Sequence, residues 1–181
     1  KPTSLAPRLA GLKGKTVLLF DNTQLTSQMP GYGPIFRWLS EYLENEQGAT
    51  CSYNSRNLLR EPNAGLVKLA DEIRQSGVDA VVVALCNAGI TQATSLFCAE
   101  IEARGLPCVQ MCTDLGYSLA GITASSYAPG LPIVMAQPAS GEKEVYGKEQ
   151  TLAVAPEIVA GLTADPAKLI ARFRERFSTG E

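Results

Sequence analysis

The sequence predicts an α/β protein built on a parallel sheet. Five apolar stretches of strand length, at 16–20, 49–53, within 78–86, at 106–111 and at 131–136, alternate with segments of helical spacing. The third, VDAVVVALC, is rich in valine and apolar at consecutive positions, as strands buried on both faces are. Such alternation is typical of a sheet with helices on both sides. We expect one domain over residues 1–181, because this length fits five strands and their helices.

The segments between the strands are predicted mainly as helices. In 62–76, for example, Leu66, Leu69 and Ile73 recur at helical spacing, and Gly77 follows them. Residues 1–15 are expected to form an extended lead-in, and 24–33 a loop. Helices are expected at 34–47, 62–76 and 91–104, from 115 onward, at 150–162, and at 166–177 within a C-terminal helical region at 165–181.

We expect these elements to form a flavodoxin-like three-layer αβα sandwich, with a five-stranded parallel sheet in the order 2-1-3-4-5. Ligands of such sheets bind at the carboxyl ends of the strands, near the point where the strand order reverses. That edge would collect three polar clusters that follow strands one, three and four: Asp21-Asn22-Thr23, Cys86-Asn87 and Cys112-Thr113-Asp114. The sequence therefore predicts a small-molecule cleft there.

Composition excludes several kinds of site. The chain contains no histidine, which excludes Ser-His-Asp and Cys-His catalysis within this chain alone. No CxxC pair compensates, so a zinc site is not expected. Neither GxGxxG nor GxxxxGK(S/T) occurs, so no motif supports a bound nucleotide or flavin. We expect no cofactor and no metal, and acid–base work must fall to Asp, Glu, Cys, Tyr or Lys, or to a partner chain.

Charge and cysteine usage point to a cytoplasmic protein. The net charge is −2, and the basic residues are spread out except for Arg172, Arg174 and Arg176, which gives no sign of a nucleic-acid surface. No apolar run approaches the length of a membrane span, and the N-terminus lacks the apolar core of a signal peptide. Five cysteines without paired spacing fit a reducing compartment. We expect a small-molecule substrate and an oligomer, with no nucleic-acid or membrane partner.

Cys86 is the main candidate for chemistry. It is predicted to stand where the third strand opens into a helix, and a helix N-terminus favours a thiolate. A thiol that opens to solvent there would serve as a nucleophile, a base or a redox group. The alternative is a small buried cysteine in an ordinary turn, and the sequence leaves both interpretations open.

Several segments resemble the UGSC family, which is named for a four-residue motif containing selenocysteine or cysteine. They are LKGKTV at 12–17 with Asp21-Asn22 after it, VDAVVVALCNAGIT at 78–91, IEARGLPCV at 101–109 and LPIVMAQP at 131–138. They follow the family's order over most of the chain. The resemblance implies a flavodoxin-like fold and a thiol- or selenol-centred site at the end of the third strand.

This chain departs from the family pattern at the motif itself. The four motif positions fall on Ala88, Gly89, Ile90 and Thr91, so both cysteine positions are replaced and only the glycine is kept. The family's proline-histidine-proline after strand five is Ala136-Gln137-Pro138 here. Either Cys86 has taken over the chemistry, or the chain is a diverged subunit whose partner carries the catalytic thiol.

The stretch VVVALCNAG is also similar to the cysteine-asparagine-threonine turn of the aspartate/glutamate racemase superfamily. Cys112-Thr113 is similar to that superfamily's second cysteine-threonine. Paired thiols can remove and return a proton without a cofactor. However, only 26 positions separate Cys86 from Cys112, whereas the second cysteine of those enzymes comes much later. The similarity therefore serves as a chemical analogy only.

We interpret the chain as an enzyme, or an enzyme subunit, that acts on a small carboxylate, thioester or sulfur-containing molecule. Cys86 would be nucleophile or base, and Cys112 or Asp114 the second acid–base group. Further polar residues at the edge would bind substrate: Asp21, Asn22, Thr23, Asn87, Gly89, Thr91, Thr113, Gln137 and Ser140.

Two other functions stay open. The chain is either a non-catalytic member of a hetero-oligomer with a homologous chain that keeps the cysteine motif, or a small-molecule sensor. A reversible Cys86–Cys112 disulfide is geometrically conceivable, because both residues end strands expected to be neighbours. Cys51 and Cys108 are interpreted as packing residues.

Overall fold

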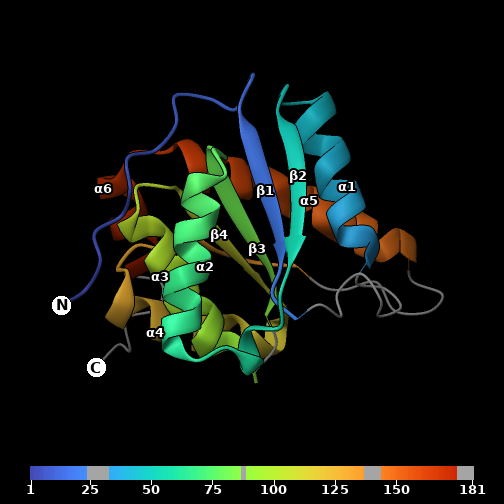
Figure 1. Ribbon diagram of the computed structural model, residues 1–181. Helices are drawn as coiled ribbons and strands as arrows, with labels where there is room; N and C mark the ends of the chain where they lie inside the picture. Colours follow the sequence, from blue (N-terminus) through green and yellow to red (C-terminus); the bar gives the residue numbers. More distant parts are fainter. Residues whose placement is uncertain (24–32, 87–88, 137–143, 175–181) are drawn as a thin grey trace.

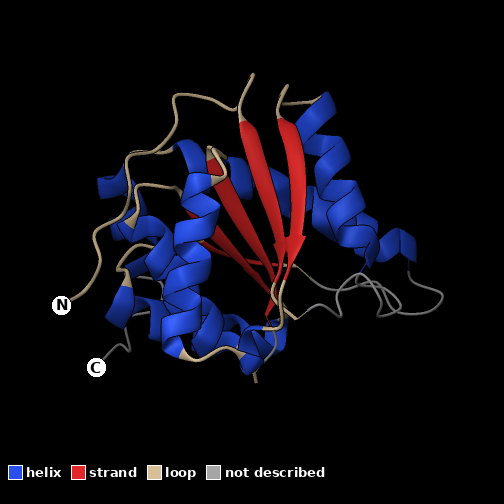
Figure 2. Cartoon of the chain, in the orientation of Figure 1, coloured by secondary structure: helices blue, strands red, loops and turns tan. Residues whose placement is uncertain are grey.

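The computed structural model describes residues 1–23, 33–86, 89–136 and 144–174. Its centre is a five-stranded parallel sheet in the order β2-β1-β3-β4-β5, which confirms the predicted topology. The strands are β1 (Thr16–Asp21), β2 (Thr50–Ser55), β3 (Ala80–Cys86), β4 (Cys108–Cys112) and β5 (Ile133–Met135). Figure 2 shows the strands converging at their carboxyl ends, so residues that follow β1, β3 and β4 meet at one edge.

Helices cover both faces of the sheet (Figure 1). One face is covered by α2 (Asn63–Gln75), α3 (Thr91–Ala103) and α4 (Asp114–Tyr127), and the other by α1 (Gly33–Asn45) and α5 (Glu144–Thr163). A short 3-10 turn, η1 (Leu58–Arg60), precedes α2, and α6 (Pro166–Leu169) continues into a π-helical stretch, η3 (Ile170–Arg174). None of the helices described here combines the length and apolar character needed to cross a membrane.

The predicted elements differ from the observed ones mainly at their ends. The last long helix begins at Glu144 rather than near residue 150, and the fifth strand shortens to Ile133–Met135. The predicted loop at 24–33 falls almost wholly outside the described residues, and Gly33 already belongs to α1. The C-terminal helical region is described as far as Arg174, so its predicted end lies outside the described residues.

The lead-in before β1 is fastened to the helices on both faces. The amide of Thr3 donates to the carbonyl of Tyr127 in α4, and the amide of Leu9 donates to Leu162 in α5. Between them, the Arg8 guanidinium donates to the Glu102 carboxylate at 2.7 Å, and only 2% and 0% of these side chains is exposed. Loss of either side chain would leave the other charge buried without a partner, which is costly in free energy.

The pairing of β3 with β4 is irregular near the carboxyl edge. The register shifts between Val83 and Cys86, and the Ala84–Leu85 peptide bond within this stretch is cis. Beyond the shift, Cys86 stands directly opposite Cys112. The two thiols that end neighbouring strands are therefore side by side on the same face of the sheet, the face covered by α3 and α4.

Candidate functional site

Cys86 ends β3 at the carboxyl edge, as predicted, but none of its surface is exposed. The expectation that its sulfur opens to solvent is therefore wrong for the described structure. The physical reason is the close approach of α4. A Cβ atom on Gly116 would lie 2.8 Å from the Cys86 carbonyl oxygen and 3.1 Å from the Thr91 hydroxyl, so the missing side chain lets the helix close over the strand end.

Polar side chains nevertheless converge on the enclosed sulfur. The Gln110 side-chain amide donates to Cys86 Sγ at 3.2 Å, and the Asn22 amide donates to it at 3.5 Å. These donors are themselves held: Asn22 also donates to the Thr94 hydroxyl at 2.9 Å. The Ser95 hydroxyl donates to Gln110 Oε1 at 3.1 Å. The site is thus a hydrogen-bonded network in which the sulfur is an acceptor.

This network sets the protonation of the two edge thiols. Burial alone raises the pKa of Cys86, but hydrogen bonds from Cys112, Gln110, Thr94 and Asn22 outweigh it and hold the pKa below its ordinary value. For Cys112, burial and then the hydrogen bond and charge at Cys86 all raise the pKa well above its ordinary value. Of these two thiols, Cys86 is therefore the one that loses its proton more readily, and Cys112 is the one that keeps it.

A second pair of core thiols has a different environment. Burial, followed by a hydrogen bond with Cys108 and charge on it, raises the pKa of Cys98 well above the ordinary range. Cys98 lies in α3 and Cys108 begins β4, and both are fully buried, which confirms Cys108 as a packing residue. At Cys51 in β2, which is partly exposed, burial and then the Glu44 carboxylate raise the pKa to about 11. Among Cys51, Cys86, Cys98 and Cys112, only Cys86 has a lowered pKa.

Asp21 forms a smaller polar cluster at the same edge, and it is fully buried. The backbone amide of Thr23 donates to Asp21 Oδ1 at 3.0 Å, and the Thr23 hydroxyl lies 3.2 Å from the same oxygen. The Tyr53 hydroxyl donates to Oδ2 at 3.3 Å. The carboxylate is thus fixed by β1, the turn after it and the neighbouring strand β2.

The remaining predicted site residues are distributed unevenly. Thr113 joins the site, because its amide and its hydroxyl both donate to the Cys86 carbonyl, at 2.8 and 3.3 Å. Thr91 is buried beside Gly116, whereas Asp114 and Gly89 are exposed. Asp114 accepts from the amide of Leu115 at 2.9 Å in the first turn of α4. Predicted residues that lie outside the described ones are Asn87, Gln137 and Ser140.

Sequence reasoning missed Gln110, Thr94, Ser95 and Tyr53. A signal for Gln110 was present, because it is the one amide in the otherwise apolar strand CVQMC, and a buried polar side chain requires a partner. Thr94 and Ser95 lie on the inward face of α3, where hydroxyls look like ordinary helix residues. Tyr53 lies in a strand, and only the pairing of β2 with β1 brings its hydroxyl to Asp21.

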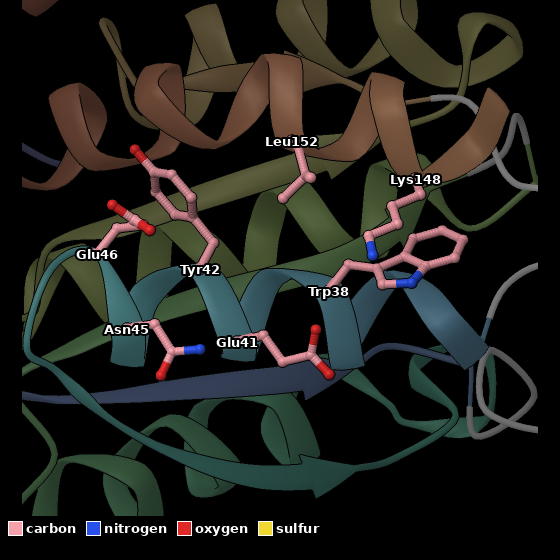
Figure 3. Close-up of a pocket in the computed structure, with 7 residues that line it drawn as sticks. All are labelled: Trp38, Glu41, Tyr42, Asn45, Glu46, Lys148 and Leu152. Carbon is pink, nitrogen blue, oxygen red and sulfur yellow. The ribbon is translucent and has the colours of Figure 1, made fainter. Parts of the chain in front are cut away.

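Two other features bear on what the described residues can bind. They contain no group of three or more His, Cys, Asp or Glu side chains placed to hold a metal ion. A groove of about 380 Å³ lies away from the thiols, between α1 and α5, where Trp38 and Tyr42 from one helix face Lys148 and Leu152 from the other (Figure 3). Because this groove lies on the α1–α5 side, it contains none of the predicted site residues.

Comparisons with known proteins give a family and a remote likeness. The structure is similar to ribose 5-phosphate isomerase type B from Trypanosoma cruzi, with a TM-score of 0.40, 13% sequence identity, and coverage of 90% of this chain and 96% of that one. A mutant of that enzyme gives a TM-score of 0.40 and 12% identity with the same coverage. No curated protein matches the sequence. A model described as the UGSC family matches residues 1–164, and the chain therefore belongs to the UGSC family.

Proposed function

We propose that this chain is an enzyme, or a subunit of an enzyme, that acts on a small carboxylate, thioester or other sulfur-containing molecule at the carboxyl edge of β1, β3 and β4. The observation that supports it is the pair of side-chain amides, from Asn22 and Gln110, that donate hydrogen bonds to the Cys86 sulfur and help to hold its pKa below the ordinary value in spite of burial. A core cysteine needed only for packing requires no such donors. Thiolate character is what a nucleophile or a base requires.

The chemistry assigned to Cys86 and Cys112 follows from the opposite directions of their pKa shifts. As a base, the Cys86 thiolate takes a proton from an acidified carbon of the substrate, and the electron pair of the broken C–H bond stays on the substrate. Cys112, which keeps its proton, is the neighbouring acid. Asp21, with Thr23, is assigned to positioning a polar group of the substrate at the same edge.

Burial of Cys86 places a condition on this proposal. Because no surface of the residue is exposed, substrate reaches the sulfur only if the edge rearranges. The test is native alkylation with iodoacetamide at neutral pH, with the labelled cysteines identified by mass spectrometry. We expect Cys86 to be alkylated before Cys98, which is equally buried but has a raised pKa. Protection of Cys86 for as long as Cys98 would contradict a reactive Cys86.

A matched set of variants extends the test to turnover. Cys86→Ser and Cys112→Ala are expected to abolish conversion of substrate, whereas Cys98→Ala is expected to leave it unchanged. The third variant controls for loss of a buried thiol from the same core, since all three residues belong to one apolar cluster. If Cys112→Ala retains turnover, the acid assigned here is wrong.

The second candidate is a non-catalytic subunit of a hetero-oligomer. It is supported by the replacement of both motif cysteines, by Ala88 and Thr91, together with the enclosure of Cys86. It predicts that the purified chain is inactive alone and gains turnover when mixed with a homologous chain that keeps the motif. Turnover by the isolated chain that is lost with Cys86→Ser would exclude this candidate and support the first.

A further inference from the structure

The outward face of α4 is apolar. Leu115, Leu119 and Ile122 follow one another at helical spacing, and 72%, 43% and 47% of these residues is exposed. The residues of α4 that face the protein are small instead: Gly116, Ala120, Gly121 and Ala124. The helix thus places its large apolar residues on the solvent side, which reverses the pattern of an amphipathic surface helix.

The apolar outward face of α4 is not shared by α2, the helix on the other side of α3. Both α2 and α4 pack against α3 and cover the same face of the sheet (Figure 1). The exposed residues of α2 are mainly charged or polar and include Lys68, Asp71, Glu72, Arg74 and Gln75. On α4, by contrast, no charged residue occurs from Leu115 to Tyr127.

We propose that this face of α4 binds a second copy of the chain, with the two α4 helices packed antiparallel across a two-fold axis. The absence of charge on this face favours this occupant. Two identical faces meet in such a dimer, so a charged face would oppose itself, whereas the uncharged stretch after Asp114 meets its copy without repulsion or loss of charge hydration. This inference does not depend on the proposed chemistry at Cys86.

Helix geometry fixes the register of the contact. The exposed stripe runs from Leu115 through Leu119 and Ile122 to Ser126, so its midpoint lies between the middle two residues. In an antiparallel pair, Leu119 of each copy therefore faces Ile122 of the other, and each Leu115 faces the Ser126 end. Two equivalent leucine–isoleucine contacts form the centre of the interface.

The small contact area of the α4 helix predicts a weak dimer. A helix of 14 residues is about 21 Å long, and with a width of about 10 Å it covers roughly 200 Å². A stable interface buries about 800 Å² on each partner, so the helix pair alone supplies only part of that area. The association is expected to depend on concentration over the micromolar range and above.

The experiment is sedimentation velocity of the full chain over a concentration series. We expect a dimer fraction that rises with concentration in the natural chain. Leu119→Glu is expected to remove it, because a carboxylate would be buried against Ile122 of the second copy. Val67→Glu is the matched control, since Val67 is an outward apolar residue of α2 with 38% exposure. This control should leave the dimer unchanged.

A compensating variant tests the register. Leu119→Glu combined with Ile122→Lys places each new carboxylate opposite a new ammonium group, so we expect the double variant to recover at least part of the association. Circular dichroism and urea unfolding of each variant establish that loss of the dimer is not loss of the fold.

Three outcomes would overturn the proposal. The first is a chain that stays monomeric at every concentration, and the second is a dimer that Leu119→Glu leaves intact or that Val67→Glu disrupts equally. The third is a monomeric chain that dimerises only after residues 175–181 are deleted, which would assign the face of α4 to that segment of the same chain.

Discussion

The two buried thiol pairs of this protein differ in what surrounds them. Cys86 and Cys112 end β3 and β4, and neutral donors from Asn22 and Gln110 reach the sulfur of Cys86. Cys98 and Cys108 lie in the same apolar cluster, but no such donors serve to lower the pKa of Cys98. Burial raises the pKa in both places, so the donors decide the sign of the final shift.

The pairs also differ in how their surroundings are held. Near the second pair, the Glu102 carboxylate accepts from the Cys108 amide at 2.9 Å, from the Ala6 amide and from Arg8. A buried charge organises that end of β4, whereas the side-chain donors that reach the Cys86 sulfur are uncharged amides. Cys86 and Cys98 are therefore equally buried but differ in chemistry. Variants near each of them separate the effect of charge from the effect of hydrogen bonding.

The largest expected effect is on the buried ion pair between Arg8 and Glu102. Glu102→Gln leaves the Arg8 guanidinium buried without a counter-charge, and we expect the free energy of unfolding to fall by about 3–5 kcal/mol. Urea unfolding measures the change. Glu100→Gln is the matched control, because Glu100 pairs with Arg104 on the same helix but is 38% exposed, and it should cost less than about 1 kcal/mol. Equal losses from the two variants would contradict the role given to burial.

The next effect concerns the neutral network. Gln110→Leu removes the amide that donates to Cys86 and the oxygen that accepts from Ser95, so we expect a loss of about 2–3 kcal/mol in the free energy of unfolding. The pKa of Cys86 should rise as well, because one of its donors is gone. Thiolate absorbance against pH measures this second effect. An unchanged titration would show that Gln110 is a packing residue only.

Replacement of the sulfurs sharpens the comparison further. Cys86→Ala leaves the Gln110 amide without an acceptor, whereas Cys86→Ser supplies one, so we expect serine to be about 1–2 kcal/mol more stable than alanine at this position. At Cys98, where no amide donor depends on the sulfur, serine should have no advantage over alanine. Thermal or urea unfolding of the four variants decides this, and the same serine-to-alanine difference at both positions would remove the distinction.

The smallest effect is the pH dependence of stability. The folded pKa of Cys98 lies above its ordinary value of 9.0, so the folded chain keeps a proton that the unfolded chain releases above that pH. This stabilisation is complete below pH 9.0 and is lost as pH rises towards the folded pKa, by up to about 1.4 kcal/mol per pH unit. The free energy of unfolding, measured from neutral pH upward, should therefore decline less steeply in Cys98→Ala than in the natural chain. Identical slopes would refute the assignment.

The sheet was predictable because it depends on features that are local in the sequence. Apolar strands alternate with segments of helical spacing, and parallel strands joined by helices leave few orders open. This information places Cys86 and Cys112 at neighbouring strand ends, as observed. The ends of helices were harder to predict from the sequence. The first turns of α5, at Glu144, carry no strong start signal.

The environment of the thiols was not predictable by the same means. Whether Cys86 is open or enclosed depends on how closely α4 approaches, and that distance is set by Gly116, thirty positions away in the sequence. The side chains of the network come from three separate elements: Asn22 lies after β1, Gln110 lies in β4, and Thr94, which accepts from Asn22, lies in α3. Tertiary packing alone brings them to one sulfur.

The close approach at Gly116 has a mechanical consequence. On one side of the α4 backbone lies the carbonyl of Cys86, with no side chain between them, and on the other side Leu115 stands out into solvent. A Cβ atom at position 116 would meet that carbonyl oxygen at 2.8 Å, so any residue larger than glycine requires α4 to shift away from the end of β3. Such a shift would loosen the packing around the Cys86 sulfur, which is fully buried with α4 in its present place.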